Sequence, residues 1–420
     1  MSGNEKKLLV PRLRFPEYRA EDGWGSEFGN MIFDQISNKD HNSDLPVLAI
    51  TQEQGAIPRE MIDYHVSVTD KSLESYKVVE VGDFIISLRS FQGGIEFSRY
   101  RGICSPAYVI LRLRHGHSED YFRHYLKTDR FIAQMIKNLE GLRDGKMISY
   151  KQFSELELPT PPRDEQQKIA DCLSSLDDLI AAETYKLDTL KTHKKGLMQQ
   201  LFPREGETVP GLRFPEFREA GEWKETLFGK LVVKSFYGTS SSTSNTGKYP
   251  VLRMGNMVDG ALSFSNLAYI DLDEKSFAKI RLAPGDILLN RTNSPDLVGK
   301  VSIFDQDIEC ITASYIVTYR LDRAQVVPEF CNLILNTPRC QRKIRALARP
   351  SISQANINPT SFKNELTVAL PNIEEQRRIV SCFSDIDERI SSQIKKIELL
   401  KVQKAGLMQQ LFPVPDGAVA

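Results

Sequence analysis

Hydrophobic residues recur at steps of four and three along two stretches of the chain, a spacing that predicts two long amphipathic helices. Each run extends for about four and a half heptads, which is typical of a coiled coil. The positions are Ile169, Leu173, Leu176, Ile180, Leu187, Leu190, Leu197 and Leu201 in the first run, and Ile379, Phe383, Ile386, Ile390, Ile397, Leu400, Leu407 and Leu411 in the second. We therefore expect one helix over 163–203, a second over 373–413, and pairing of the two along these hydrophobic seams.

The polar residues in the seams predict how the two helices pair. Each seam is interrupted at the same two places, by Glu183 and Lys194 in the first run and by Gln393 and Lys404 in the second. Parallel pairing in register would set Lys194 beside Lys404. Antiparallel pairing, in which paired residue numbers add to about 580, brings Lys404 to Asp177, and Lys194 to Asp385 and Asp387. Polar seam positions can specify orientation, so an antiparallel pair is expected.

The second half of the sequence repeats the first. The segment GLMQQLFP occurs at 196–203 and again at 406–413, and residues 165–203 align with 375–413 without a gap. The offset between the copies is constant at 210 positions. Two copies are too few for a solenoid, so the chain is interpreted as a duplicated protein with two halves.

A proline-containing strap, at 10–19 and at 209–218, precedes each globular region, and Trp24 corresponds to Trp223 after it. Two prolines in six residues exclude a helix and favour an extended segment that lies across another element. The second strap directly follows GLMQQLFP, whereas the first strap begins the sequence. The order of strap, globular region and helix is thus circular, and we expect the two chain ends to lie close together.

Each globular region is predicted to combine short strands with helices. A Gly-Asp turn before an apolar strand occurs at 81–89 and 284–291, β-branched strands follow at 107–113 and 314–321, and helical patterns follow at 119–139 and 328–347. The segment 239–247 is interpreted as a polar loop without a counterpart in the first half. The expected fold class is α+β, with two α/β domains separated by a long antiparallel coiled coil in a pseudo-twofold circular arrangement. The expected boundaries are 1–162 and 204–372 for the domains, 163–203 and 373–413 for the helices, and 414–420 for a tail.

Charge and composition restrict the possible partners and the compartment. Lysine plus arginine and aspartate plus glutamate balance at 55 each in 420 residues, so any nucleic-acid surface must be local. The start of the sequence lacks the apolar core of a signal peptide, and no apolar run approaches the ~18 residues of a membrane span. We therefore expect a cytoplasmic protein that does not interact with membranes.

No metal site is predicted from the cysteines or histidines. The six cysteines form no CxxC pair and are interpreted as buried thiols of a reducing compartment; they are Cys104, Cys172, Cys310, Cys331, Cys340 and Cys382. His115, His117 and His124 have no carboxylate at a fixed spacing, so a solvated turn is favoured over a metal site there.

The sequence lacks the motifs of enzymes that modify or cut DNA. An adenine methyltransferase needs a (D/N/S)PP(Y/F/W) loop, and the nearest string, TPPR at 160–163, lacks both its first and its last residue. That string is better explained as a proline-stiffened helix entry. The acids at 273–274 and 296 do not follow the order of a nuclease site, and Gly247-Lys248 lacks the spacing of a phosphate loop. A non-catalytic protein is therefore expected.

The chain resembles the specificity subunit of type I restriction–modification systems over essentially its whole length. The helix entries at 165–169 and 375–379, the helix exits at 194–202 and 404–412, and the Gly-Asp strands carry this resemblance. It implies two target-recognition domains that each read one half of a bipartite DNA site. It also implies two methyltransferase subunits docked along the helices and restriction subunits beyond them, with S-adenosylmethionine, ATP and magnesium on those partner subunits.

The paired helices would serve as the spacer between the two domains. Their seam of roughly 33 residues, at 1.5 Å per residue, would hold the domains about 50 Å apart. This length corresponds to roughly 15 base pairs of duplex. The first half departs from the family pattern, because Ser87-Leu88-Arg89-Ser90 replaces the fuller Asn290-Arg291-Thr292 form of the second half.

Candidate DNA-reading residues are arginine, lysine, asparagine and glutamine side chains in polar or glycine-rich loops, because these residue types pair with guanine and adenine edges or hold phosphates. They are Arg89, Gln92, Arg99, Arg101, Arg143 and Lys146 in the first domain, and Lys248, Arg253, Asn256, Arg291, Asn293, Gln354 and Asn356 in the second. Glu165, Gln166, Glu375 and Gln376 lie in first helical turns, where a structural role is favoured.

Two other classes of function remain open on the sequence alone. One is a self-contained enzyme, which the missing motifs disfavour. The other is a protein-interaction scaffold in which the duplicated domains hold proteins and not DNA. Salt-dependent binding to duplex DNA distinguishes the scaffold from a DNA-reading subunit.

Overall fold

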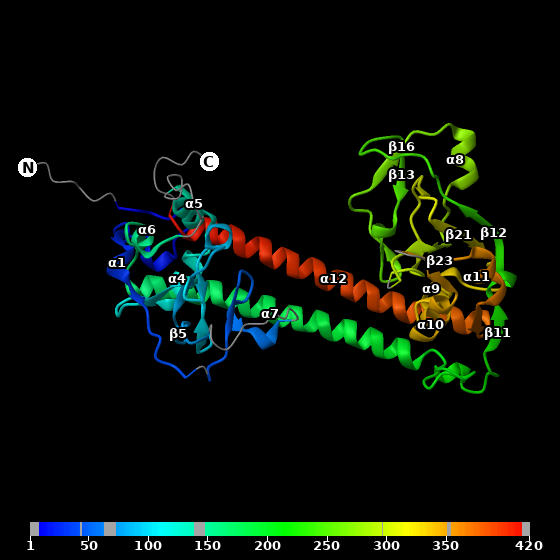
Figure 1. Ribbon diagram of the computed structural model, residues 1–420, viewed down its shortest axis with the longest axis horizontal. Helices are drawn as coiled ribbons and strands as arrows, with labels where there is room; N and C mark the ends of the chain where they lie inside the picture. The colour runs from blue at the N-terminus through cyan, green and yellow to red at the C-terminus, as the bar shows by residue number, and fades with distance from the viewer. Residues whose placement is uncertain are drawn as a thin grey trace, which may run out of the picture. The chain divides into compact units, whose positions relative to one another are not determined.

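The computed structural model describes residues 8–42, 44–62, 73–137, 148–295, 297–350 and 354–413. The chain divides into two compact units, and each is described by itself. Unit 1 comprises Met1–Tyr185 with Ile394–Ala420, and unit 2 comprises Lys186–Gln393. Two long helices, α7 (Arg163–Gln200) and α12 (Ile373–Leu411), contribute residues to both units (Figure 1).

Unit 1 is built on a four-stranded antiparallel sheet with the order β2-β9-β6-β7. All the strands of unit 1 are β1 (Gly25–Phe28), β2 (Phe33–Ile36), β3 (Leu48–Thr51), β4 (Gly55–Pro58), β5 (Lys77–Val79), β6 (Phe84–Ile86), β7 (Glu96–Phe97), β8 (Gly102–Cys104), β9 (Val109–Leu113) and β10 (Glu157–Thr160), among the described residues. The helices are α1 (Gly29–Ile32), α3 (Ser90–Gly93), α4 (Glu119–Tyr125), α5 (Asp129–Lys137) and α6 (Tyr150–Ser154). Phe84 and Leu111 face a core that includes α4 and α7, whereas Ile85 and Ile110 face a second, smaller core, so the sheet is covered on both sides.

Unit 2 repeats this sheet as β12-β21-β17-β19, also antiparallel, and adds further strands. The strands are β11 (Lys224–Leu227), β12 (Val232–Tyr237), β13 (Tyr249–Leu252), β14 (Met257–Val258), β15 (Ala261–Leu262), β16 (Ala268–Ile270), β17 (Asp286–Asn290), β18 (Thr292–Asn293), β19 (Val301–Phe304), β20 (Ile311–Thr312), β21 (Ile316–Leu321), β22 (Ala348–Pro350), β23 (Ala355–Ile357) and β24 (Thr367–Leu370). The helices are α8 (Glu274–Ile280), α9 (Pro328–Leu335), α10 (Pro338–Ala346) and α11 (Pro359–Glu365). Mixed helix and sheet content in both units agrees with the expected α+β class. The predicted strand segments contain β6, β9, β17 and β21.

Each predicted helical segment in the globular regions is in fact two helices. The break before α5 is capped by Thr128, whose hydroxyl accepts a hydrogen bond from the Phe131 amide. The break before α10 is capped in the same way by Thr337, and Pro338 occupies the first helical position. An N-cap side chain satisfies a free amide and starts a new helix, so the single-helix prediction was wrong at both places. The end of the first predicted segment, 138–139, lies outside the described residues.

The two straps and the two GLMQQLFP segments are joined in the same way in each unit. In unit 1 the Leu13 amide donates to the Gln410 carbonyl at 3.0 Å, and in unit 2 the Leu212 amide donates to the Gln200 carbonyl at 2.9 Å. Each strap therefore lies across a helix exit, as predicted, although it also contains one 3₁₀ turn, at Pro16–Tyr18 and Pro215–Phe217.

The phenylalanine of each GLMQQLFP segment packs against other aromatic rings in the main core of its unit. Phe412 contacts Tyr121 and Tyr125 in the core that holds Trp24, and Phe202 contacts Trp223 at 5.9 Å between ring centroids. All four of these tryptophan and GLMQQLFP phenylalanine side chains are buried. Removing a buried phenylalanine side chain typically costs about 3–5 kcal/mol, so the helix exits contribute substantially to both cores.

The segments of α7 and α12 within each unit run antiparallel. In unit 1, Lys404 contacts Asp177 at 2.5 Å and Lys396 contacts Glu183 at 2.5 Å, so residue numbers fall along one helix as they rise along the other. In unit 2, Lys194 contacts Asp387 at 2.6 Å. The predicted ion pairs of Lys404 with Asp177 and of Lys194 with Asp387 are therefore present. All the predicted seam positions are buried or half-buried.

Candidate nucleic-acid interface

A buried ion pair fixes the start of each long helix to the strap of the same unit. Arg14 donates from Nε and Nη2 to the Glu165 carboxylate at 2.7 and 2.8 Å, and Arg213 repeats this contact with Glu375 at 2.8 and 2.6 Å. Both carboxylates are nearly inaccessible to solvent. The hydrogen bonds that Arg14 and Arg213 donate to these carboxylates raise the pKa of the two guanidinium groups. The acids of the helix entries thus have the structural role that was expected, but they act through an arginine of the strap.

The glutamines that follow these acids connect the long helices to α4 and α9. The Gln166 side chain accepts a hydrogen bond from the Ser118 amide and donates to the Pro161 carbonyl, both at 2.9 Å. The Gln376 side chain accepts from the Val327 amide and donates to the Pro371 carbonyl. Because Ser118 and Val327 immediately precede α4 and α9, each helix entry positions the globular part of its own unit.

A second repeated ion pair fixes the strand that leads to the candidate loop. Asp83 accepts two hydrogen bonds from Arg112, at 2.7 and 2.8 Å, and Asp286 accepts two from Arg320, at 2.8 and 2.7 Å. Both aspartates are buried and follow glycines at positive φ, Gly82 at 96° and Gly285 at 94°. The residues just after β6 and β17, including the candidates Arg89 and Arg291, therefore project from a rigid sheet.

The described candidates of unit 1 are exposed and lie at two places. Gln92 lies on α3 and Arg89 is its N-cap residue, whereas Arg99 and Arg101 lie between β7 and β8. Arg101 contacts Glu80 there at 3.1 Å. Arg143 and Lys146 lie outside the described residues.

Lys127 holds the C-terminal end of α3 in place through hydrogen bonds of its ammonium group. It donates to the Gly93 carbonyl at 2.9 Å and to the buried carboxylate of Glu96. Burial lowers the pKa of Lys127 and raises that of Glu96, and the contact between them opposes both shifts. The short helix next to Arg89 and Gln92 is therefore held to the rest of unit 1 by Lys127.

Three candidates of unit 2 come together around a small sheet with the order β18-β23-β22. Asn293 lies on β18, Asn356 lies on β23, and Arg291 directly precedes β18. The Arg291 guanidinium lies over the exposed Tyr237 ring, 5.5 Å from its centroid. Its Nε atom is buried and has no hydrogen-bond partner among the described residues. Gln354 is exposed immediately before β23.

Arg253 and Asn256 lie together at a surface hollow of about 460 Å³, which Ser265, Asn266 and Tyr315 also line. Asn256 is 4% exposed, and its amide is engaged in holding this turn. It accepts from the Arg253 amide and donates to the carbonyls of Ser263 and Ser265. The sequence could not distinguish this structural asparagine from one that faces solvent. Lys248 directly precedes β13, a strand of a different sheet, and its ammonium group lies 4.9 Å from the centroid of the Tyr249 ring.

Residues 29–192 and 231–401 match the family described as the type I restriction modification DNA specificity domain. These two segments make up most of the chain. The chain belongs to this family.

Relatives of this specificity family include two proteins of Methanocaldococcus jannaschii. The putative type I restriction enzyme MjaX specificity subunit is 30% identical over 200 residues, which make up 47% of this chain and 46% of that protein. The type I restriction enzyme MjaVIII specificity subunit is 24% identical over 357 residues, 83% of this chain and 81% of that protein. The chain thus matches about half the length of the first relative and most of the second.

Two solved structures show the same fold. A structure described as the basis of complex assembly and conformational transition of the type I R-M system has a TM-score of 0.56 and 15% identity, with coverage of 93% of this chain and 98% of that one. The type I restriction–modification S subunit from M. genitalium has a TM-score of 0.54 and 14% identity, with coverage of 97% and 100%.

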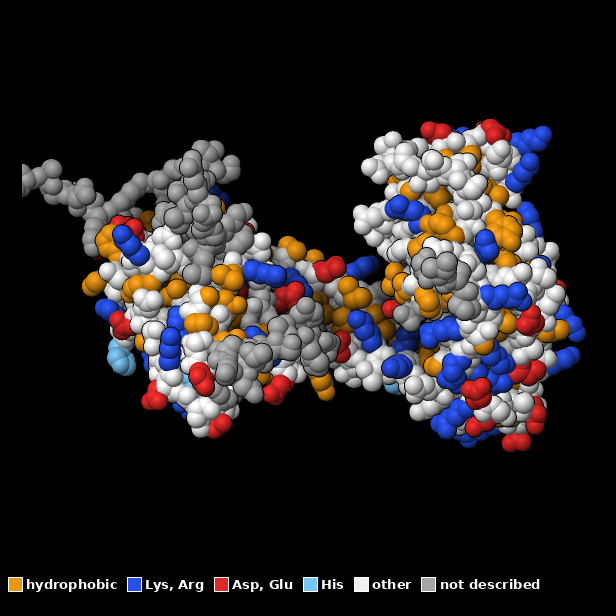
Figure 2. Space-filling model, in the orientation of Figure 1, with side chains coloured by type: hydrophobic (Ala, Val, Ile, Leu, Met, Phe, Trp, Pro, Cys, Tyr) orange, Lys and Arg blue, Asp and Glu red, His pale blue; other side chains and the backbone are white. Residues whose placement is uncertain are grey.

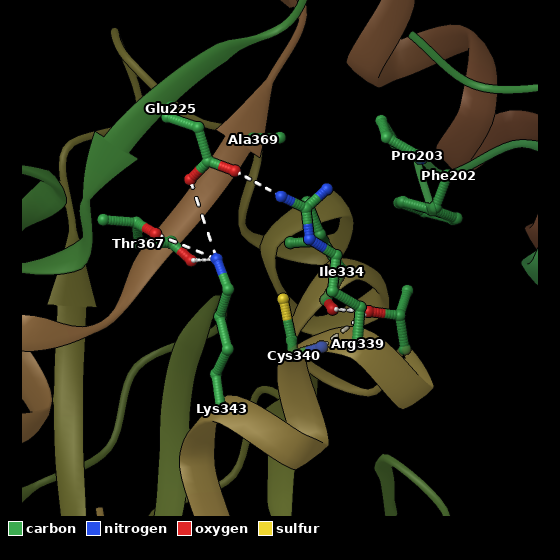
Figure 3. A pocket seen from close by; sticks show the side chains of 10 residues that line it. Phe202, Pro203, Glu225, Ile334, Arg339, Cys340, Lys343, Thr367 and Ala369 are labelled. Carbon is green, nitrogen blue, oxygen red and sulfur yellow. Dashed lines mark hydrogen bonds and ion pairs between the residues drawn. The ribbon is translucent and has the colours of Figure 1, made fainter. Parts of the chain in front are cut away.

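Within this member of the specificity family, a basic segment of unit 2 was not recognised from the sequence. Five of the eleven residues 339–349 are arginine or lysine and none is acidic. Figure 2 shows basic side chains gathered over part of unit 2, with acidic ones interspersed. Two of the five point inward: Arg339 and Lys343 both lie toward Glu225, and Lys343 donates to Thr367 (Figure 3). A third, Arg342, contacts Glu205 at 2.6 Å.

The other two, Arg345 and Arg349, are exposed and have no ion-pair partner within the described ranges. The local run of basic residues was the available signal for them. Which of the five cations lack an acidic partner could not be predicted from the run itself, because the glutamates that pair with the other three come from the distant segment 205–225.

His124 differs from the solvated turn predicted for the histidine group. It is 3% exposed, lies on α4 and is within hydrogen-bond distance of the Ser174 hydroxyl at 3.2 Å. Burial, together with nearby positive charges, lowers its pKa to about 3.

Across the described part of the chain, no helix is sufficiently long and apolar to cross a membrane.

Proposed function

We propose that the chain is a non-catalytic subunit that reads a bipartite, asymmetric DNA site. It would position adenine-N6 methyltransferase subunits over the two half-sites and carry the restriction subunits. Double-stranded DNA, two methyltransferase subunits and restriction subunits are its proposed partners. S-adenosylmethionine, ATP and magnesium would be held by those partner subunits.

The contrast between a repeated frame and diverged surfaces carries this proposal. The frame includes Arg14–Glu165 and Asp83–Arg112 in unit 1, and Arg213–Glu375 and Asp286–Arg320 in unit 2. Two copies of one frame would present two surfaces in related ways.

The surface that follows the repeated sheet differs between the units. Leu88 lies five positions after Asp83, whereas Arg291 lies five positions after Asp286. Different side chains on equivalent positions support recognition of two different half-sites, and hence an asymmetric site.

The long helices are proposed as the spacer between the two reading surfaces. Arg163–Gln200 has 38 residues and Ile373–Leu411 has 39, so the helices extend for about 57 and about 59 Å at 1.5 Å per residue. The ion pairs of Lys404 and Lys194 with acids of the other helix support a fixed register along this spacer.

Exchange of residues 204–372 for the equivalent segment of another family member tests the modular proposal. The exchanged chain is expressed with its methyltransferase subunits, and methylated adenines are mapped across a host genome that has no other adenine methylation. One half of the recognised site should change while the other half persists. Change in both halves, or in neither, would show that the units do not read DNA independently.

Binding to duplex DNA tests the rival scaffold function. The complex with methyltransferase subunits should bind DNA with a steep decrease in affinity as salt rises, because phosphate contacts release counterions. A complex that assembles fully but shows no salt-dependent DNA binding would support a protein scaffold.

A further inference from the structure

The small sheet of unit 2 places three polar side chains in one row. β23 is the middle strand, with Asn356 in register with Thr292 of β18 on one side and with Arg349 of β22 on the other. We propose that Asn356 and Arg349 form a base-reading row, in which Asn356 contacts an adenine and Arg349 contacts a guanine of the half-site recognised by unit 2. This inference rests on the proposed function, since it assumes that unit 2 meets duplex DNA.

Alternation along the strands directs this row outward. Ala355 and Ile357, the neighbours of Asn356 on β23, are buried in the main core of unit 2. Ala348, next to Arg349, packs against the same core. Because successive side chains of a strand point to opposite faces, Thr292, Asn356 and Arg349 share the face that is turned away from the core. Arg349 is exposed, and Thr292 and Asn356 are half-buried.

Thr292 determines which atoms Asn356 presents. The Thr292 hydroxyl donates to Oδ1 of Asn356 at 2.7 Å. This bond fixes the orientation of the amide, with Nδ2 as a donor that has no partner among the described side chains, and with a second lone pair left on Oδ1. A donor beside an acceptor matches N7 and the N6 amino group of adenine in the major groove. Thr292 is thus a positioning residue, and Asn356 is the reading residue.

Arg349 presents the complementary chemistry for guanine. Two guanidinium donors match the O6 and N7 acceptors of that base, and Arg349 has no acidic partner among the described residues to occupy them. Neighbouring strands lie about 4.8 Å apart and base pairs about 3.4 Å, so the two residues would read positions one or two steps apart.

The surroundings of the row suit the DNA backbone. Arg345, near the end of α10, is an exposed cation four positions before Arg349. Such a cation would contact a phosphate and fix the register, while Asn356 and Arg349 supply the discrimination. No equivalent three-stranded sheet is found in the described part of unit 1.

The test uses the full chain in complex with its methyltransferase subunits and a set of duplexes in which each base pair of the recognised site is replaced in turn. Asn356→Ala should lose about tenfold or more of its discrimination at one adenine position, and Arg349→Ala should lose it at one guanine position one or two steps away. Discrimination at the other half-site should be unchanged. Thr292→Val should weaken discrimination at the adenine of Asn356, and Thr292→Ser, which keeps the hydroxyl, should restore it.

Arg342→Ala is the matched control, because Arg342 belongs to the same basic segment but is paired with Glu205. It should leave discrimination at every position unchanged. Thermal unfolding of each variant reports whether the fold is retained. Equal loss of affinity for every duplex, or no loss of discrimination in folded variants, would overturn the base-reading row. If the unaltered complex itself failed to bind duplex DNA, the proposed function would be at fault and not this inference alone.

Discussion

Arg14 and Glu165 are 151 positions apart in the sequence and form a buried ion pair through two parallel hydrogen bonds. Arg213 and Glu375 repeat the same contact in unit 2 at a separation of 162 positions. The two pairs join the middle of each strap to the beginning of a long helix. The tryptophan that follows each strap is the single tryptophan of its unit, so each unit has its own fluorescent reporter.

Glu165→Ala is expected to lower the free energy of unfolding of unit 1 by about 3–5 kcal/mol, because it leaves the Arg14 guanidinium buried without its counter-ion. Urea unfolding followed by Trp24 fluorescence in a Trp223→Phe background measures this change. Lys168→Ala is the control, since Lys168 and Glu17 form an exposed pair worth about 0–1 kcal/mol. Equal effects of the two substitutions would show that the buried pair contributes nothing beyond a surface contact.

The pair formed by Lys404 and Asp177 tests the helix register. Lys404→Glu should destabilise unit 1 by about 1 kcal/mol, because two acids then meet on adjacent helices. Adding Asp177→Lys should recover most of this loss, which a double-mutant cycle would report as favourable coupling. Lys401→Glu, at an exposed position of the same helix, should have little effect. Absence of coupling between positions 177 and 404 would contradict the antiparallel register.

Removal of one heptad from each long helix should shorten the spacer. Deleting 180–186 and 394–400 removes both partners of the Glu183–Lys396 pair and keeps the pairs of Lys194 and Lys404. The helices would lose about 10 Å, and the gap between the two halves of the DNA site should shrink by about three base pairs. Methylated sites mapped in the host measure this gap. An unchanged gap would argue against the spacer function. A deletion in one helix alone should abolish methylation, because it shifts the hydrophobic seam of that helix out of register with the other.

The buried imidazole of His124 predicts a pH dependence of stability in unit 1. The unfolded chain binds a proton at the ordinary histidine pKa of 6.5, whereas folded His124 stays neutral down to about 3. The unfolded state therefore binds more protons between these values, and the free energy of unfolding should fall as the pH decreases below about 6.5, by up to about 1.4 kcal/mol per pH unit. The groups around His124 are Ser174, Arg123, Arg99, Asp177 and Lys404.

His124→Gln should flatten this dependence while keeping a polar group near Ser174. Urea unfolding of both chains at several pH values, monitored by Trp24, gives the comparison. Identical slopes for the two chains would show that another group controls the pH response.

Sequence patterns predicted the elements whose signals are local and periodic. The heptad spacing located both long helices, and the position of Lys404 and Lys194 in that spacing was sufficient to predict their acidic partners. The Gly-Asp turns and β-branched runs located the strands of the repeated sheet. These features depend on residues within a few turns of each other, or on a register that two helices share over many residues.

The candidate site was predicted less completely because it depends on long-range pairing. β18, β22 and β23 contain two or three residues each, and Thr292 meets Asn356 across 64 positions. Strands this short carry no detectable periodicity, so neither the pairing nor the outward row of Thr292, Asn356 and Arg349 could be recognised. Asn256 shows the opposite case. Its polar neighbours in the sequence suggested an exposed side chain, but its amide group makes three hydrogen bonds within a turn.

The location of Leu411 and Phe412 in the core of unit 1 has a consequence for how the protein is made. Ribosomes would release all the residues of the main core of unit 2, from Leu201 to Phe383, before the two side chains that complete unit 1. The half that is synthesised first would therefore finish folding last. Chains truncated shortly before residue 407 would keep all the residues of the main core of unit 2 but lack the side chains that close the core of unit 1, which would leave apolar surface exposed and prone to aggregation.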